Sequence, residues 1–118
     1  MSSGGSYKNL VVWQKSKELV LHVYKITDAF PRHEQFGLQS QIRRSAISIP
    51  SNIAEGKYRG SHKDLKHFLH MAFGSGAELE TQLSIANDLG YISNGNYNAC
   101  RSLLDEVMKM LNTMIAST

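Results

Sequence analysis

The sequence predicts an all-α protein, an antiparallel up-and-down four-helix bundle whose second helix is kinked at Pro50. Four segments carry apolar side chains at alternating steps of three and four residues, the spacing of one helix face, and no segment alternates like a strand. Turn-forming stretches join the segments, which favours antiparallel neighbours. A chain of 118 residues suffices for one such domain. We expect the bundle domain over residues 8–118, after a flexible leader over residues 1–7.

The first helix is predicted from about Asn9 to Ala29, and Pro31 ends it, because the residue before a proline disfavours helical backbone. One apolar seam follows the four–three spacing: Val12, Ser16, Leu19, Val23, Ile26 and Phe30. A second stripe lies beside it: Trp13, Val20 and Tyr24.

The second helix is predicted to open near Phe36 and to close at Gly56, a residue type common just past helix ends. Its seam is Leu38, Ile42, Ala46, Ile49 and Ile53. Pro50 lies inside this pattern, where it removes a backbone donor and clashes with the preceding turn. Because the apolar period continues beyond Pro50, we expect a kink rather than a break.

The third helix starts at a pattern that resembles a capping box, Ser61 followed three residues later by Asp64, and it ends at Gly90. Its seam is Leu65, Leu69, Ala72, Gly76, Leu79, Leu83 and Ala86. Gly74 and Gly76 each weaken a helix interior by roughly 1 kcal/mol. We expect the close approach of a neighbouring backbone to compensate.

The fourth helix follows turn-type residues at 93–96. Its seam is Tyr97, Cys100, Leu104, Val107, Leu111 and Met114. The apolar faces of the first and last helices are wider than one bundle core requires. They either line a generous core or form contacts between copies of the chain.

Composition indicates a soluble, cytoplasmic protein with no membrane partner. Hydrophobic residues make up 42% of the chain, but no uninterrupted apolar run is long enough to span a bilayer. The single cysteine, Cys100, excludes an internal disulfide and suits a reducing compartment.

Charge is unevenly distributed along a chain of net charge +3. Residues 36–70 carry six basic side chains against two acidic ones, whereas residues 71–118 carry two against five. The six basic residues are the candidate nucleic-acid contacts: Arg43, Arg44, Lys57, Arg59, Lys63 and Lys66. They could meet an anionic partner through its phosphates, face the acidic end within the protein, or form an ordinary solvated face.

A polar stripe occupies one face of the second helix and is matched by a shorter row on the third. Its members are Gln41, Ser45, Ser48, Asn52 and Glu55, with Ser75, Glu78 and Gln82 opposite. Such rows either form hydrogen-bond networks that fix helix register or line a site for a ligand or partner. Glu55 or Glu78 could neutralise Arg43 or Arg44.

No motif indicates an enzyme or a cofactor site. His62, His67 and His70 lack further ligands at metal-binding spacing. No serine sits in a strand-to-helix elbow, and no glycine-rich phosphate loop is present.

A family resemblance lies in the second helix, in SQIRRSAISIPSNIAEG from Ser40 to Gly56. Further matching stretches are NLVVWQKSKELVLHVY, FGLQSQIRRS, GSGAELETQL and LGYI. Together they cover residues 8 to about 115 and resemble the bacterial four helix bundle protein family. That family includes ribosomal-protein-like proteins encoded by intervening sequences of 23S rRNA genes, and it is related to accessory variability proteins of diversity-generating retroelements.

The resemblance implies a bundle that assembles into a ring, a homopentamer, without a defined activity. We therefore expect a non-enzymatic, ring-forming adaptor associated with RNA or with a nucleic-acid-processing protein. The alternative is an interaction scaffold for a partner polypeptide such as a reverse transcriptase.

Overall fold

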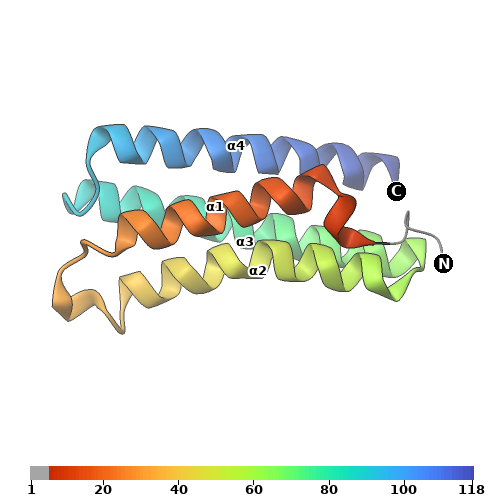
Figure 1. The fold of residues 1–118 in the computed structure, drawn as a ribbon, viewed down its shortest axis with the longest axis horizontal. Coiled ribbons are helices and arrows are strands. Elements are labelled where there is room, and N and C mark those ends of the chain that lie inside the picture. The colour runs from red at the N-terminus through yellow and green to blue at the C-terminus, as the bar shows by residue number, and fades with distance from the viewer. Residues whose placement is uncertain (1–5) are drawn as a thin grey trace.

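The protein is an all-α four-helix bundle, as the sequence predicts (Figure 1). The computed structural model describes residues 6–118, so most of the predicted leader lies outside the described residues. The helices are α1 (Val11–Thr27), α2 (Leu38–Arg59), α3 (His62–Asp88) and α4 (Asn94–Ser117), with short 3-10 helices η2 (Tyr7–Asn9) and η3 (Arg32–Glu34). Tyr7 was predicted to belong to the flexible leader, but it lies in η2 with its ring centre 5.3 Å from the ring centre of Trp13.

Successive helices run in opposite directions, and each end of the bundle therefore carries its own connections (Figure 1). The α2–α3 turn lies at the same end as the start of the described chain, at η2, and the end of α4 (Figure 1). The α1–α2 connection and the α3–α4 turn lie at the other end, with the long dimension of the molecule, 46 Å, between them. Features of α2 near its start and near its end therefore belong to opposite ends of the molecule.

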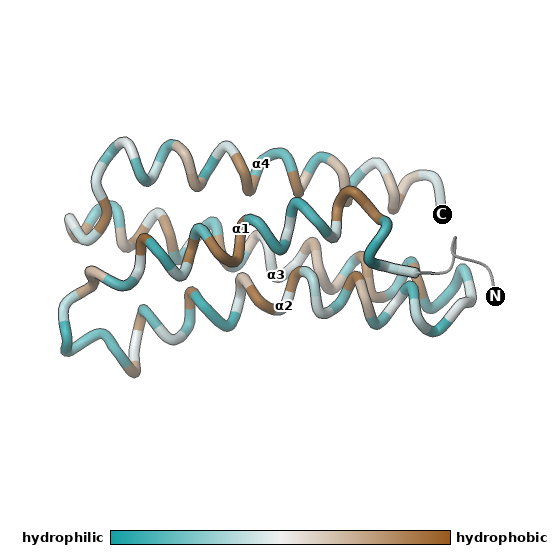
Figure 2. Tube along the Cα trace, viewed as in Figure 1, coloured by the Kyte–Doolittle hydropathy of each residue, from teal (hydrophilic) through white to brown (hydrophobic). Residues whose placement is uncertain are grey.

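The core is built from the four predicted seams, because each helix buries one stripe of apolar residues against the other three. Hydrophobic and hydrophilic positions alternate along every helix (Figure 2). The α1 seam is buried along its whole length, from Val12 to Phe30, and Ser16 is buried with it. The central residues of the other three seams are fully buried, including Ile49, Leu79 and Leu104. The seams, predicted from spacing alone, are confirmed.

Helix α2 ends later than predicted. It continues through Gly56 to Arg59, and Gly60 ends it with a left-handed φ of +84°. Gly56 is buried inside the helix, where an added Cβ would lie 2.8 Å from Cβ of Phe68 and 3.3 Å from Cα of Leu65. The prediction that Gly56 closes the helix is therefore wrong: this glycine lets α2 and α3 pack closely.

The explanation predicted for the two glycines of α3 is also wrong. Gly74 is exposed and faces open space. Gly76 is buried, but the group that an added Cβ would meet is the flexible end of the Met108 side chain rather than a backbone. The close backbone approach occurs at Gly56 instead.

Pro50 lies in an uninterrupted helix, and Ile53 beyond it is fully buried. The proline therefore does not divide α2 into two segments, and the kink itself stays a prediction. The next helix begins as predicted, since the Ser61 hydroxyl accepts a hydrogen bond of 3.0 Å from the backbone N–H of Asp64. Gly90, with φ +80°, follows the end of α3 two residues after Asp88.

Candidate nucleic-acid interface

The α2–α3 turn gathers four of the six predicted basic residues at one end of the bundle. Lys63 and Lys66 are exposed on the first turns of α3, and Lys57 is half-buried in the last turn of α2. Within the described residues none of these three lysines forms an ion pair. Arg59 differs, because its Nε donates to Glu55 Oε2 at 3.0 Å and its guanidinium lies 5.0 Å from the Phe68 ring centre.

Arg43 and Arg44 do not belong to this cluster. They lie roughly 20 Å from Lys57 along α2 at 1.5 Å per residue, near the opposite end of the bundle. All six residues were predicted to contact nucleic acid because they lie in one basic segment of the chain, residues 36–70. The straight course of a long helix separates them in space.

Arg43 is held by α1 rather than by Glu55 or Glu78, so the predicted neutralisation is wrong for this residue. Its Nε donates to Thr27 Oγ1 at 2.9 Å, and its Nη2 donates to the Tyr24 carbonyl at 3.2 Å. The guanidinium also lies 4.3 Å from the Tyr24 ring centre, and Nη2 is 3.8 Å from Asp28 Oδ1. Arg43 therefore joins two helices, with part of its charge balanced by Asp28.

Some residues of the polar stripe form hydrogen bonds, and some line a groove. Ser48 and Ser75 join α2 to α3 through a hydrogen bond of 2.8 Å between their hydroxyls, and Asn52 Nδ2 donates to Ser48 Oγ at 2.9 Å. Such bonds between facing side chains can hold neighbouring helices in register. Glu55, at the end of the stripe, instead faces Arg59.

A groove of about 450 Å³ lies beside this network, between α2 and α3. Its walls are Gln41, Arg44, Ser45, Ser48, Glu78 and Gln82. The Gln82 side-chain oxygen is buried without a hydrogen-bond partner. Neither Arg44 nor Glu78 forms an ion pair within residues 6–118. The groove thus offers donors, acceptors and both signs of charge to a polar group.

A second groove, at the corner where α1 connects to α2, was not predicted from the sequence. It has a volume of about 570 Å³ and is lined by Arg32, Arg43 and Arg44 together with Tyr24 and Phe36. Phe36 was expected to begin the second helix, but the helix begins at Leu38 and Phe36 is 91% exposed. One feature of the sequence could have indicated this groove: Phe36 lies outside the apolar seam of the second helix and next to a glycine.

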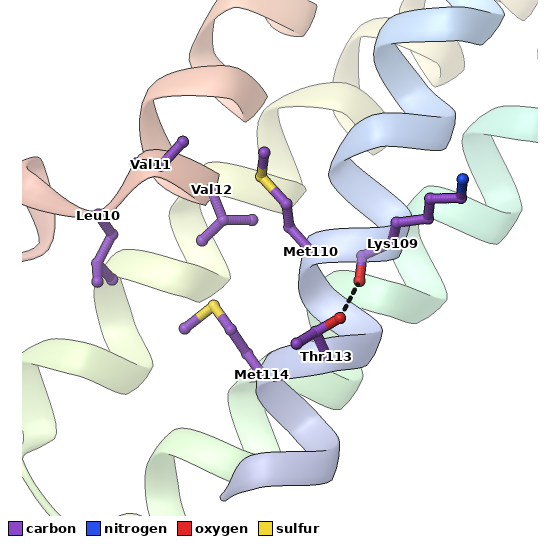
Figure 3. A pocket seen from close by; sticks show the side chains of 7 residues that line it. All are labelled: Leu10, Val11, Val12, Lys109, Met110, Thr113 and Met114. Carbon is purple, nitrogen blue, oxygen red and sulfur yellow. Dashed lines mark hydrogen bonds between the residues drawn. The ribbon is translucent and has the colours of Figure 1, made fainter.

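Two apolar grooves flank α1. One, of about 490 Å³, lies between the start of α1 and the end of α4, where Val12, Met110 and Met114 surround the hollow (Figure 3). The other, of about 360 Å³, lies between α1 and α2 and includes Trp13, Ile47 and Pro50. These grooves are the structural counterpart of the wide apolar face predicted for α1.

The reactive groups of the bundle are either buried or dispersed. Burial raises the pKa of the Cys100 thiol to about 12, although nearby Arg101 opposes the shift. His62, His67 and His70 are exposed, and no three His, Cys, Asp or Glu side chains of the described chain are grouped to hold a metal ion. Between residues 6 and 118, no helix has the length and apolar character needed to cross a membrane.

These features define a small all-α bundle with polar and basic surface grooves. The family model described as 23S rRNA-intervening sequence protein matches residues 8–113, and the chain belongs to this family. A solved structure of a protein of unknown function from the S23 ribosomal protein family of Bacteroides thetaiotaomicron is 29% identical, with a TM-score of 0.80. The match covers 89% of this chain and 98% of that one. No curated protein matches the sequence.

Proposed function

We propose that the protein is a non-enzymatic, self-associating adaptor that binds RNA phosphates through the lysines of the α2–α3 turn. The observation that carries the proposal is that Lys57, Lys63 and Lys66 lie at one turn without ion pairs among the described residues. Charges that no carboxylate neutralises are free to replace the counterions of a phosphate backbone. Membership in a family named for 23S rRNA intervening sequences supports an RNA partner.

Self-association would place several copies of this basic turn on one particle. A single patch of three lysines binds weakly, but copies held together act with a raised effective concentration. The apolar grooves on both sides of α1 support such assembly, since exposed apolar hollows are stabilised when a second surface covers them. The number of copies that the family resemblance implies is five.

The test is a salt titration of RNA affinity, measured by fluorescence anisotropy with a labelled RNA. The wild-type affinity should fall steeply with salt and depend little on sequence. Each of Lys57→Glu, Lys63→Glu and Lys66→Glu should lower the log–log slope by at least about 0.7–0.9, the value for one lost phosphate contact. Helicity and particle mass should stay unchanged, because Lys63 and Lys66 are exposed and none of the three is fully buried.

Lys25→Glu provides the matched control. Lys25 is exposed near the end of α1, away from the basic turn, and its substitution changes the net charge by the same amount. It should leave the slope close to the wild-type value. An equal loss in Lys25→Glu would contradict the proposal, as would the absence of binding to single-stranded or structured RNA at low salt.

The second candidate is the scaffold for a partner polypeptide, such as a reverse transcriptase. The α2–α3 groove with Arg44, Glu78 and the unpaired Gln82 oxygen favours it, because a peptide backbone could satisfy these groups. If RNA binding is absent, this candidate takes precedence. It predicts that Gln82→Leu weakens capture of the partner while leaving the particle mass unchanged.

A further inference from the structure

The groove at the α1–α2 corner combines features that the α2–α3 turn lacks. It is a hollow of about 570 Å³, within the usual range of ligand sites, and it brings cationic and aromatic side chains together. Its members come from α1, from the connection around η3 and from the start of α2. It lies at the end of the bundle opposite the three lysines.

Phe36 is the aromatic surface of this groove. With 91% of the residue exposed, its ring is left in water, although phenylalanine is among the residues most often buried. An unpaired nucleobase that stacks on the ring would remove one face of the ring and one face of the base from water. Stacking tolerates any base, because every base has a π-face.

The charge of the groove suits a phosphate chain. Three guanidinium groups line it, and its one lining carboxylate, Asp28, lies 3.8 Å from Arg43. Arg32 and Arg44 form no ion pair in the described part of the chain. This excess of positive charge favours an anionic occupant over a second copy of a chain that itself carries +3.

The connection that carries Phe36 is braced on two sides. Glu34 Oε1 accepts a hydrogen bond of 3.1 Å from the backbone N–H of Leu38, at the start of α2. The other oxygen of Glu34 accepts one of 3.1 Å from the Tyr91 hydroxyl, in the α3–α4 turn. Because Glu34 is engaged in these bonds, its carboxylate is held at the helix start and the neighbouring turn rather than in the groove.

We propose that this corner groove binds single-stranded RNA, with one unpaired base stacked on Phe36 and the flanking phosphates on Arg32 and Arg44. The inference rests on the proposed RNA binding and adds a preference for unpaired nucleotides. In a duplex the bases are stacked within the helix and paired, so they are not free to cover an isolated ring. The lysines of the α2–α3 turn, in contrast, contact phosphates of either form.

The test compares a labelled single-stranded RNA of about ten nucleotides, a length within the site sizes of single-strand binders, with a duplex of the same length. Phe36→Leu keeps an apolar side chain but removes the aromatic face. It should weaken binding of the single strand about 5- to 150-fold, the effect of losing one stacked base. Binding of the duplex should not change, and Phe36→Tyr should retain the wild-type affinity.

Leu21→Ala is the control for general loss of apolar surface, since Leu21 is 64% exposed on α1 outside the groove. It should bind both RNAs as the wild type does. Arg32→Gln should lower the salt slope for the single strand by about 0.7. Circular dichroism and particle mass should match those of the wild type in every variant.

Three results would overturn the inference: a Phe36→Leu variant that binds the single strand normally, one that weakens both RNAs equally, or one that changes only the particle mass. The last would assign Phe36 to a protein interface. If the lysine variants lose RNA while Phe36→Leu does not, the inference fails and the proposed function stands. If the wild-type protein binds neither RNA, the proposed function fails as well.

Discussion

A single glycine, Gly56, allows α2 and α3 to pack closely. Gly56 is the position at which the two backbones approach, since an added Cβ would meet Leu65 Cα and Phe68 Cβ. Gly74, in contrast, faces open space. The sequence predicted Gly74 inside a helix and Gly56 at a helix end, but it could not assign their roles, because the difference lies in what the neighbouring helix presents.

Gly56→Ala should lower the free energy of unfolding by about 1–3 kcal/mol, because a side chain at a tight contact forces the helices apart. Gly74→Ala is the matched control and should raise it by about 0.5–1 kcal/mol, since alanine favours the helix and nothing obstructs its Cβ. Urea denaturation of the two variants measures both effects. A stabilising Gly56→Ala would contradict the close packing of α2 on α3.

Cys100 should make the free energy of unfolding depend on pH. Burial raises its thiol pKa to about 12, whereas an unfolded cysteine titrates near 8.5. Between these values the unfolded chain releases the thiol proton and the folded chain retains it. The free energy of unfolding should therefore fall as the pH rises above about 8.5, by up to about 1.4 kcal/mol per pH unit from this group.

Cys100→Ala isolates that contribution. Denaturation at pH 8 and pH 10 should show a smaller loss of stability in the variant than in the wild type. The native thiol should also resist modification by a thiol reagent at pH 8 and react once the chain is unfolded, because the thiolate is the reactive form. Rapid native labelling would contradict the buried placement.

Helix positions were predictable at the scale of elements, whereas several helix ends were not: α2 begins at Leu38 rather than near Phe36, and the predicted turn at 93–96 is the cap and first turn of α4. The four–three spacing located the seams, and a side-chain cap located the start of α3 at Ser61. The end of α2 was assigned to Gly56 because a glycine commonly follows a helix, but a second glycine, Gly60, adopts the left-handed conformation. Only the position of α3 determines which glycine must stay helical.

Pro50→Ala tests whether the proline weakens α2. The substitution restores the backbone donor toward the carbonyl of Ala46 and removes the ring clash, so it should raise the free energy of unfolding by about 1 kcal/mol. Pro31→Ala is the control, since Pro31 has an extended backbone before η3 and gains no helical bond. It should be destabilising by about 0.4–1 kcal/mol through greater freedom of the unfolded chain.

A clear loss of stability in Pro50→Ala would indicate that the proline is required by packing. Pro50 lines the apolar groove with Trp13, so the particle mass of the variant should be measured alongside. An unchanged mass together with greater stability is the expected result.

At the scale of the whole molecule, the bundle could be predicted from the sequence. The arrangement of the candidate sites could be predicted only in part. The lysines at 57, 63 and 66 meet because a tight turn joins their helices. Arg43 turned out to bind Thr27 and Tyr24, a pairing set by the crossing of α1 and α2. The connection that carries Phe36 is tied to the α3–α4 turn by the hydrogen bond from Tyr91 to Glu34, a contact between residues 57 positions apart that no local pattern reveals.

The central claim is that several copies of this bundle act together on RNA. Sedimentation velocity of the protein mixed with a labelled RNA, recorded at separate wavelengths for protein and label, tests it directly. At low salt we expect a protein particle near five times the 13.2 kDa chain mass, with the RNA sedimenting in the same boundary and released as salt is raised. A 13.2 kDa monomer, or an RNA boundary unaffected by the protein at low salt, would contradict it.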